Sequence, residues 1–363
     1  MRTAAFNWSR KAKIERSVAL AALVLAALGP FIFNDYWANQ ILVETFLFGI
    51  AAASLIFLSA YGGMVSLAQT ALFGIAGVII GNLVTKGGAG GTSKGLHLGW
   101  DPTLALVAAI AMTTAIGLIF GAVAARSTGI YFLMITLTYS VITTYFLGQV
   151  TIISGFSGIG GINNYTPPWV GDVVADPIRL YYVSLITAVL SYALIRYVVR
   201  TPFGISFQGV RDEPIRMSSL AYNVPLHRTL AFGFAAFLAS LSGILYVWWS
   251  GQIAPGNVDL PETINLLVIA VIGGLTRIEG AWVGALTFII IQNYVRDFTF
   301  PGLGFGGTLF GGSFNTVIGI IFLVIVLVSP SGLMGIWDRA LSTRLRVGRP
   351  RRAAEAPTAG TGG

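Results

Sequence analysis

The chain has 363 residues, of which 55% are hydrophobic and only 10% are charged, and its mean hydropathy is +0.79. A soluble domain carries about 25% charged residues, so this composition excludes an ordinary soluble fold and is typical of a membrane protein. The formal net charge is +8, but the basic residues flank apolar runs, a pattern that the positive-inside bias explains without any nucleic acid.

Apolar runs follow one another along most of the chain, and a spanning helix needs about 20 such residues. The runs lie near 17–33, 40–60, 64–85, 102–125, 128–150, 178–199, 229–251, 263–275, 281–298 and 314–330. They predict an all-α, polytopic membrane protein of about ten transmembrane helices, with broken or short glycine-rich segments. Three parts are expected: a basic cytoplasmic N-terminus at 1–16, a transmembrane domain at 17–335 and a basic, disordered tail at 336–363.

The basic residues predict the orientation of these spans. With the N-terminus in the cytoplasm, most of the 22 lysines and arginines fall on the inside, in both tails and in the loop at 200–228. Lys86, Lys94, Arg179 and Arg296 are left outside. This asymmetry favours a multi-pass protein of the cytoplasmic membrane with both termini in the cytoplasm.

Glu44 is the ionisable residue that lies clearly inside a predicted span, about one turn from its outer end. Such residues often mark ion or solute pathways, but Glu44 can also snorkel to the surface or bond a neighbouring helix. The scarcity of other intramembrane charges argues against a proton-coupled mechanism. A self-sufficient secondary transporter of a small solute is kept as the alternative function.

Two apolar runs, 64–85 and 263–275, are interrupted or ended by glycine. Glycine-broken helices at matching places in two halves of a transporter often mark the pathway, and the competing interpretation is close helix packing through glycine. Either run can also be re-entrant, which would leave eight or nine spans. The candidates for pathway or hinge residues are Glu44, Gly62, Gly63, Ser66, Gln69, Thr70, Gly273 and Gly274.

The loop at 200–228 is the longest charged loop, and it contains a predicted short helix that begins at Pro214. Asp212 or Glu213 suits the cap before that proline, and Asn223 suits the C-terminal turn. Ile215, Ser219 and Leu220 would share one face of this helix. The face either lies on the lipid surface or docks a cytoplasmic partner.

Catalytic and metal-binding patterns are missing from the sequence. It has no phosphate-binding GxxxxGK[ST] motif, so ATP hydrolysis is not expected in this chain. A GxGxxG match at Gly302, Gly304 and Gly307 lies between two apolar runs without the strand that a dinucleotide site needs. With no cysteine and only two histidines, we expect no catalytic residue, no metal and no cofactor.

Several motifs occur in the order found in one known family. The stretches at 61–74, 126–137, 154–162, 202–223 and 272–285 resemble the conserved stretches of the branched-chain amino acid ABC transporter permease family, of the LivM type. Departures occur at Gln69, where the family usually has histidine, at Ala221 or Tyr222, where it usually has glycine, and at Ala281, where proline is common. The departures bear on the substrate more than on the architecture.

The resemblance implies a permease subunit of an ATP-driven importer for branched-chain amino acids or a related small polar solute. It implies cytoplasmic ATPase subunits that bind ATP and magnesium, a second permease of similar fold, an extracytoplasmic solute-binding protein and surrounding membrane lipid. It also implies that the predicted short helix couples to the ATPase, through Arg211, Asp212, Glu213, Arg216, Ser219, Leu220 and Asn223.

Overall fold

A computed structural model describes residues 21–86, 95–173, 175–296 and 332–337, together with Ser17, Gly319, Leu323, Leu327 and Arg339. The predicted run at 314–330 falls almost wholly outside these residues. So do the GxGxxG match and most of both predicted tails. The remaining predicted runs can be compared with the structure.

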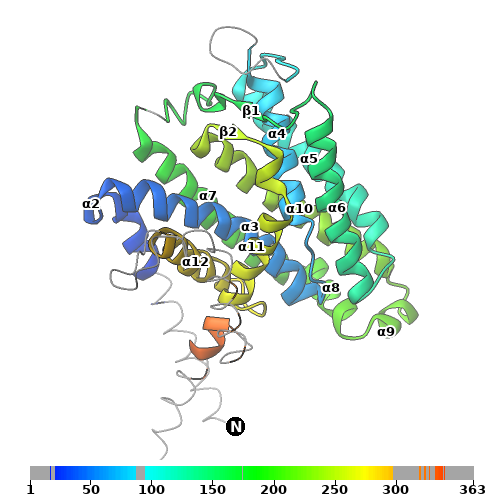
Figure 1. The fold of residues 1–363 in the computed structure, drawn as a ribbon. Helices are drawn as coiled ribbons and strands as arrows, with labels where there is room; N and C mark the ends of the chain where they lie inside the picture. The colour runs from blue at the N-terminus through cyan, green and yellow to red at the C-terminus, as the bar shows by residue number, and fades with distance from the viewer. Residues whose placement is uncertain are drawn as a thin grey trace, which may run out of the picture.

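The described part of the chain is an all-α membrane fold, as the sequence predicts (Figure 1). Its helices are α2 (Gly29–Ile32), the π-helix η1 (Trp37–Leu42), α3 (Val43–Gly62), α4 (Gln69–Val84), α5 (Pro102–Ala124), α6 (Ile130–Gln149), α7 (Pro177–Arg200), α8 (Pro202–Asp212), α9 (Pro214–Ser219), α10 (Val224–Ser250), α11 (Leu260–Gly273) and α12 (Gly280–Arg296). Two short strands, β1 (Ile159–Gly160) and β2 (Gln252–Ile253), pair antiparallel, and short 3₁₀ turns lie at Ile162–Asn164 (η2) and Pro255–Val258 (η3).

Six helical segments among the described residues are long and apolar enough to cross a membrane. They are Trp37–Gly62, Pro102–Ala124, Ile130–Gln149, Pro177–Arg200, Val224–Ser250 and Pro255–Gly273. Helix α4 is apolar but has only 16 residues, because it begins after a non-helical stretch at 63–68. The expected count of about ten spans is therefore a prediction that these residues do not confirm.

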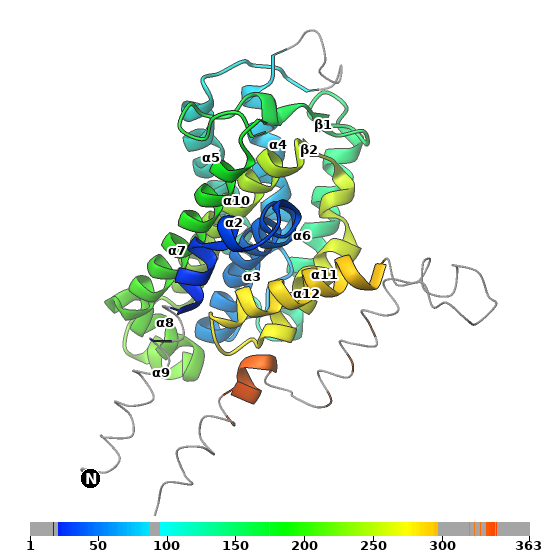
Figure 2. The ribbon, with the colours of Figure 1, turned by 90° about the vertical axis from the view of Figure 1, so that its left-hand side faces the viewer.

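Helices α3 and α10 form the centre of the molecule, with the other helices around them (Figures 1 and 2). In the most apolar stretch of each helix, 89% of the residues are buried in the α3 segment and 72% in α10. The corresponding share is 22% in α5 and 28% in both α6 and α7. The exposed faces of α5, α6 and α7 carry large apolar side chains such as Leu104, Ile119 and Tyr145. Bilayer lipid can cover such faces, so the burial pattern fits the membrane location.

Helix starts follow local chemistry closely. Asp101, Thr201, Asn223 and Asp259 cap α5, α8, α10 and α11, and in each case proline follows in the first turn. Each cap oxygen accepts a backbone N–H that the helix leaves unpaired. The predicted role of Asn223 is wrong: it does not end α9 but caps α10, which begins five residues before the predicted run at 229–251.

The two ends of the fold differ in character, and the basic residues divide between them. One end holds α8 and α9, drawn at the bottom of Figure 1, and the other holds β1, β2 and the turns around them. Gly121, near the end of α5, packs against the carbonyl of Thr229, in the early part of α10 that follows α9. Arg126, which follows α5, therefore lies at the α8–α9 end. Arg179 lies at the opposite end, against Gly171. Arg126 and Arg179, which the predicted topology places on opposite sides of the membrane, thus lie at opposite ends of the described fold.

Glycine permits the closest helix contacts. A Cβ at Gly243 in α10 would collide with the carbonyl oxygen of Phe73 in α4. Likewise a Cβ at Gly273 would collide with the carbonyl of Gly280, where α11 turns into α12. Backbones approach this closely in membranes only where side chains are missing or very small.

Replacing Gly243 with alanine should therefore destabilise the protein, because α10 and α4 must separate to admit the methyl group. Overpacking of this kind costs about 1–3 kcal/mol, which a thermal melt in detergent will register as a lower midpoint. Gly256→Ala is the matched control, since nothing lies within 4 Å of a Cβ there. Equal melting midpoints for the two variants would contradict the packing interpretation.

Candidate functional site

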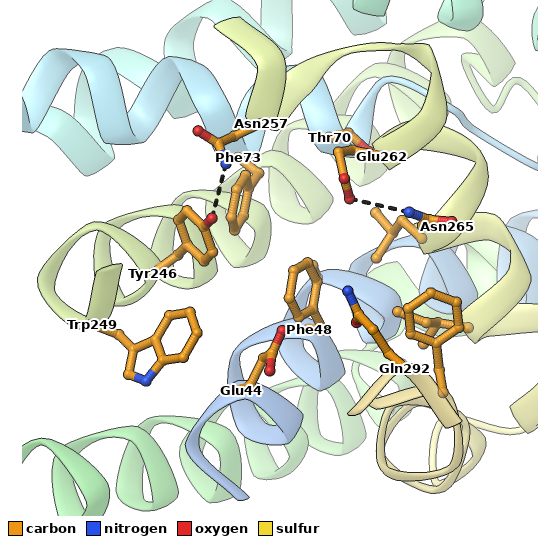
Figure 3. A pocket seen from close by; sticks show the side chains of 14 residues that line it. Glu44, Phe48, Thr70, Phe73, Tyr246, Trp249, Asn257, Glu262, Asn265 and Gln292 are labelled. Carbon is orange, nitrogen blue, oxygen red and sulfur yellow. Dashed lines mark hydrogen bonds between the residues drawn. The ribbon is translucent and has the colours of Figure 1, made fainter. Parts of the chain in front are cut away.

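A cavity of about 200 Å³ lies within the helix bundle, among α3, α4, α10, α11 and α12 (Figure 3). Its polar wall comes from Glu44, Thr70, Tyr246, Asn257, Glu262, Asn265 and Gln292. Its apolar wall comes from Phe48, Ala51, Phe73, Trp249, Leu266, Ile269 and Phe288. Polar groups from segments far apart in sequence thus converge on one enclosed space.

Two carboxylates enter this cavity without a basic partner. Glu44, at the second residue of α3, is 9% exposed, and none of the described residues forms a hydrogen bond or ion pair with it. Glu262, in the first turn of α11, accepts one hydrogen bond of 3.3 Å from Asn265. No lysine, arginine or histidine lines the described wall of the cavity.

Aromatic rings form a continuous wall beside the carboxylates. The ring of Phe48 is 6.3 Å from Phe73 and 6.1 Å from Tyr246, while Phe73 and Tyr246 are 5.1 Å apart. Trp249 continues the wall at 5.9 Å from Tyr246. The Tyr246 hydroxyl accepts a 2.9 Å hydrogen bond from Asn257, and the Trp249 N–H donates to the carbonyl of Asn39 at 3.0 Å. These bonds hold the two polar rings in place.

The Thr70 hydroxyl is a buried polar group without a partner in the described structure. Threonine inside a helix usually donates to the carbonyl four residues earlier. Thr70 is the second residue of α4, and the residue four positions earlier, Ser66, lies outside the helix. Its hydroxyl therefore remains available to whatever occupies the cavity.

Glu44 and Thr70 are the two candidate pathway residues that line the cavity. Ser66 and Gln69 lie next to it, in a buried network at the break between α3 and α4. The Ser54 hydroxyl donates to Gln69 Oε1 at 3.1 Å, and Gln69 Nε2 donates to Ser66 Oγ at 3.5 Å. This network satisfies the polar groups of the non-helical stretch that the glycine pattern predicts.

The four glycine candidates line no part of the cavity. Gly62 packs against Phe207 of α8, and Gly63 ends α3 in the left-handed conformation at φ 64°. Gly273 and Gly274 belong to the tight α11–α12 turn, and Gly274 also packs against Gly332. For these residues the structure supports close packing and helix ending.

Sequence reasoning missed most of the cavity wall. Glu262 lies one residue before the predicted run at 263–275, and Tyr246 and Trp249 lie inside the predicted run at 229–251 without being predicted as site residues. One local signal was present: Glu262 and Asn265 are three residues apart, and so share a helix face. Nothing in the sequence pairs them with Glu44, because that contact joins α3 to α11.

A second feature lies at the α8–α9 end. Helix α9 begins at Pro214 as predicted, although Glu213, at the cap position, makes no side-chain capping bond. Ile215 is 82% exposed and Leu220 is 62% exposed. Ile215 borders a shallow surface hollow whose other lining residues are Pro214, Ser218, Ser219 and the residues at 221–225. Arg216 and Ser219 are exposed beside Ile215 and Leu220. Ala221 closes the turn after α9 at φ 65°.

Helix α8 links α9 to the central helix α3. Phe207 of α8 is buried against Gly62, and its ring stacks 5.9 Å from Phe57. The Arg211 guanidinium donates to the carbonyl of Ala60 and also contacts Asp212 at 2.7 Å. Of the predicted coupling residues, Arg211 and Asp212 therefore hold the element in place, while Arg216, Ser219 and Leu220 present its surface.

Comparison with known proteins assigns the chain to a family. Residues 38–330 match a family described as branched-chain amino acid transport system / permease component. The chain is 26% identical over 213 residues to the high-affinity branched-chain amino acid transport system permease protein LivM of Escherichia coli, covering 52% of this chain and 49% of that relative.

Two proteins of Methanocaldococcus jannaschii are also similar. One is a probable branched-chain amino acid transport permease protein LivH, which is 24% identical over 45% of this chain and 52% of the relative. The other is a probable branched-chain amino acid transport permease protein LivM, which is 23% identical over 63% of this chain and 68% of the relative. The chain spans about half the length of the Escherichia coli LivM and of the Methanocaldococcus jannaschii LivH. No solved structure matches it.

Replacing Gln69 with leucine should destabilise the α3–α4 break, because Ser66 would lose its amide partner in a fully buried place. An unsatisfied buried polar group costs about 1–3 kcal/mol, measurable as a lower thermal midpoint in detergent. Gln252→Leu, at an exposed position, is the control. If both variants have the same melting midpoint as the parent protein, the network does not stabilise the break.

Proposed function

The chain belongs to the family of permease components of branched-chain amino acid transport systems, and from that premise we propose that it is the membrane-spanning subunit of an ATP-driven ABC importer. It lies in the cytoplasmic membrane, with the α8–α9 end and both termini facing the cytoplasm. It forms part of the pathway for branched-chain amino acids or a related small polar solute. The proposal rests most on one observation, the exposed apolar surface of α9 mounted on α8.

An exposed apolar helix at the end of a membrane protein needs a covering partner. The chain has no phosphate-binding motif, so the partner that covers α9 supplies the ATPase, with its ATP and magnesium. Ile215 and Leu220 form the apolar centre of this docking surface, and Arg216 lies beside them on the exposed face.

Movement of the ATPase reaches the pathway through α3. A displacement of α9 carries α8, and the contacts of Phe207 and Arg211 pass it to the last turn of α3. The other end of α3 carries Glu44 and Phe48, which line the cavity. In one packed arrangement of α3 the cavity would open to one side of the membrane, and in a second arrangement it would open to the other side.

The remaining partners follow from the family. A second permease of similar fold would complete the pore; the two related permeases of Methanocaldococcus jannaschii, a LivH and a LivM, support a pair of different chains. An extracytoplasmic solute-binding protein would deliver the solute at the end that holds β1, β2 and η3. The cavity lies near that end, since Asn257 of η3 lines it.

Purification from the native membrane in mild detergent, followed by mass spectrometry, tests the assembly. We expect an ATPase with a phosphate-binding motif and a second permease to co-purify with the chain. Uptake by the chain alone in vesicles without ATP would contradict the proposal and favour the secondary transporter. The burial of Glu44 without a hydrogen-bond or ion-pair partner among the described residues is the observation that would support that alternative.

Changing Ile215 to aspartate should release the ATPase and abolish ATP-driven uptake, because a charge would be buried at the centre of the docking surface. The melting midpoint of the isolated chain should stay the same, since Ile215 is 82% exposed. Ile215→Val keeps an apolar side chain and should retain the ATPase. Normal uptake by the aspartate variant would exclude α9 as the docking element.

A further inference from the structure

We propose that the cavity among α3, α4, α10, α11 and α12 is a binding site for the ammonium group of a small solute, with Glu44 and Glu262 as its acidic partners. This inference rests on the proposed function and deepens it, because it assigns a chemical preference to the pathway itself. Four independent features of the cavity support it.

Charge is the first feature. Glu44 and Glu262 line the same cavity, and no basic side chain lines its described wall. Burying charge without a counter-charge is costly, and a cation that enters the cavity removes that cost. Figure 3 shows the two side chains reaching the cavity from α3 and α11, so a cation can be approached from two directions.

The aromatic wall is the second feature. Phe48, Phe73, Tyr246 and Trp249 are neighbours with ring centroids 5.1–6.3 Å apart. Aromatic faces attract ammonium groups through the ring quadrupole, by about 0.5–2 kcal/mol at each favourable contact. In the view of Figure 3 the Phe48 ring lies between the carboxylates of Glu44 and Glu262. Carboxylates and ring faces together are suited to an ammonium ion.

The unpartnered Thr70 hydroxyl is the third feature. Thr70 is 5% exposed, its Oγ1 has no partner among the described residues, and it lines the cavity. A hydroxyl oxygen can accept from an ammonium N–H, and its own hydrogen can be donated to a second polar group of the solute. Thr70 therefore brings to the cavity wall a buried hydroxyl that no described residue bonds.

Size and apolar lining are the fourth feature. The cavity holds about 200 Å³, below the roughly 300–1,000 Å³ of sites for drug-sized ligands. Leu266, Ile269 and Phe288 supply a surface on which an aliphatic group can pack. The solute is therefore a small primary amine or amino acid with an apolar side chain. A solute that carries a carboxylate and no ammonium group is repelled by both glutamates.

Calorimetric titration of the purified full-length chain tests the site without any partner protein. The probes are 3-methylbutylamine, leucine and 4-methylpentanoate, which share an aliphatic skeleton and differ in their charged groups. We expect the amine to bind, leucine to bind more weakly because of its carboxylate, and 4-methylpentanoate to give no heat. Equal binding of the amine and 4-methylpentanoate would overturn the proposal.

Glu44→Gln and Glu262→Gln should each weaken amine binding at least tenfold. Asp176→Asn is the control, because it removes an exposed carboxylate that pairs with Arg179 away from the cavity. A thermal melt checks that each variant folds. If a glutamine variant does not fold, amine binding is measured in Phe48→Leu instead, which removes a ring face and should also weaken it. Unchanged amine affinity in both glutamine variants would refute the assignment.

Failure of this inference can be told apart from failure of the proposed function. Binding is measured on the single chain, whereas the importer proposal depends on co-purification and on ATP-driven uptake. A chain that assembles with its ATPase but does not distinguish the amine from the acid would keep its function and lose the ammonium site.

Discussion

Helix α3 is enclosed by other helices along nearly its whole length, so it cannot move without its neighbours. Its serine and carbonyl groups are tied to those neighbours: Ser242 of α10 donates to the carbonyl of Leu47 at 2.6 Å, and Ser54 bonds Gln69 at the start of α4. Close-packed interiors transmit strain instead of absorbing it. The cavity at one end of α3 and the α8–α9 element at the other are therefore joined by one tightly packed helix.

The turn between α11 and α12 is fixed in a different manner, by charge. The Tyr192 hydroxyl donates to Glu279 at 2.8 Å, and Arg196 lies 3.7 Å from the same carboxylate. Both partners belong to α7, which also packs against α3. Glycine lets α11 and α12 approach each other, while this polar contact sets where their hairpin lies against the central helix.

Local features of the fold could be predicted from the sequence, and non-local ones could not. Pro214 marks the start of α9, and hydropathy identifies the apolar helices, because these signals depend on neighbours in the chain. Glu44 could be identified because a carboxylate in an apolar run is conspicuous. That Glu44 shares a cavity with Glu262 and Tyr246 depends on how α3, α10 and α11 pack, which no local pattern encodes. Asn223 was misassigned because a cap residue suits both the end of one helix and the start of the next.

The left-handed conformation of Ala221 has a consequence for how α9 works. A residue with a Cβ costs about 1–2 kcal/mol in this conformation, and glycine, usual near this place in the family that the sequence resembles, would cost less. Alanine, however, leaves the turn far fewer alternative backbone conformations than glycine does. The joint between α9 and α10 is therefore stiffer than a glycine at this position would make it. Under the proposed function, less of any movement of α9 would then be lost in bending the linker before it reached α10.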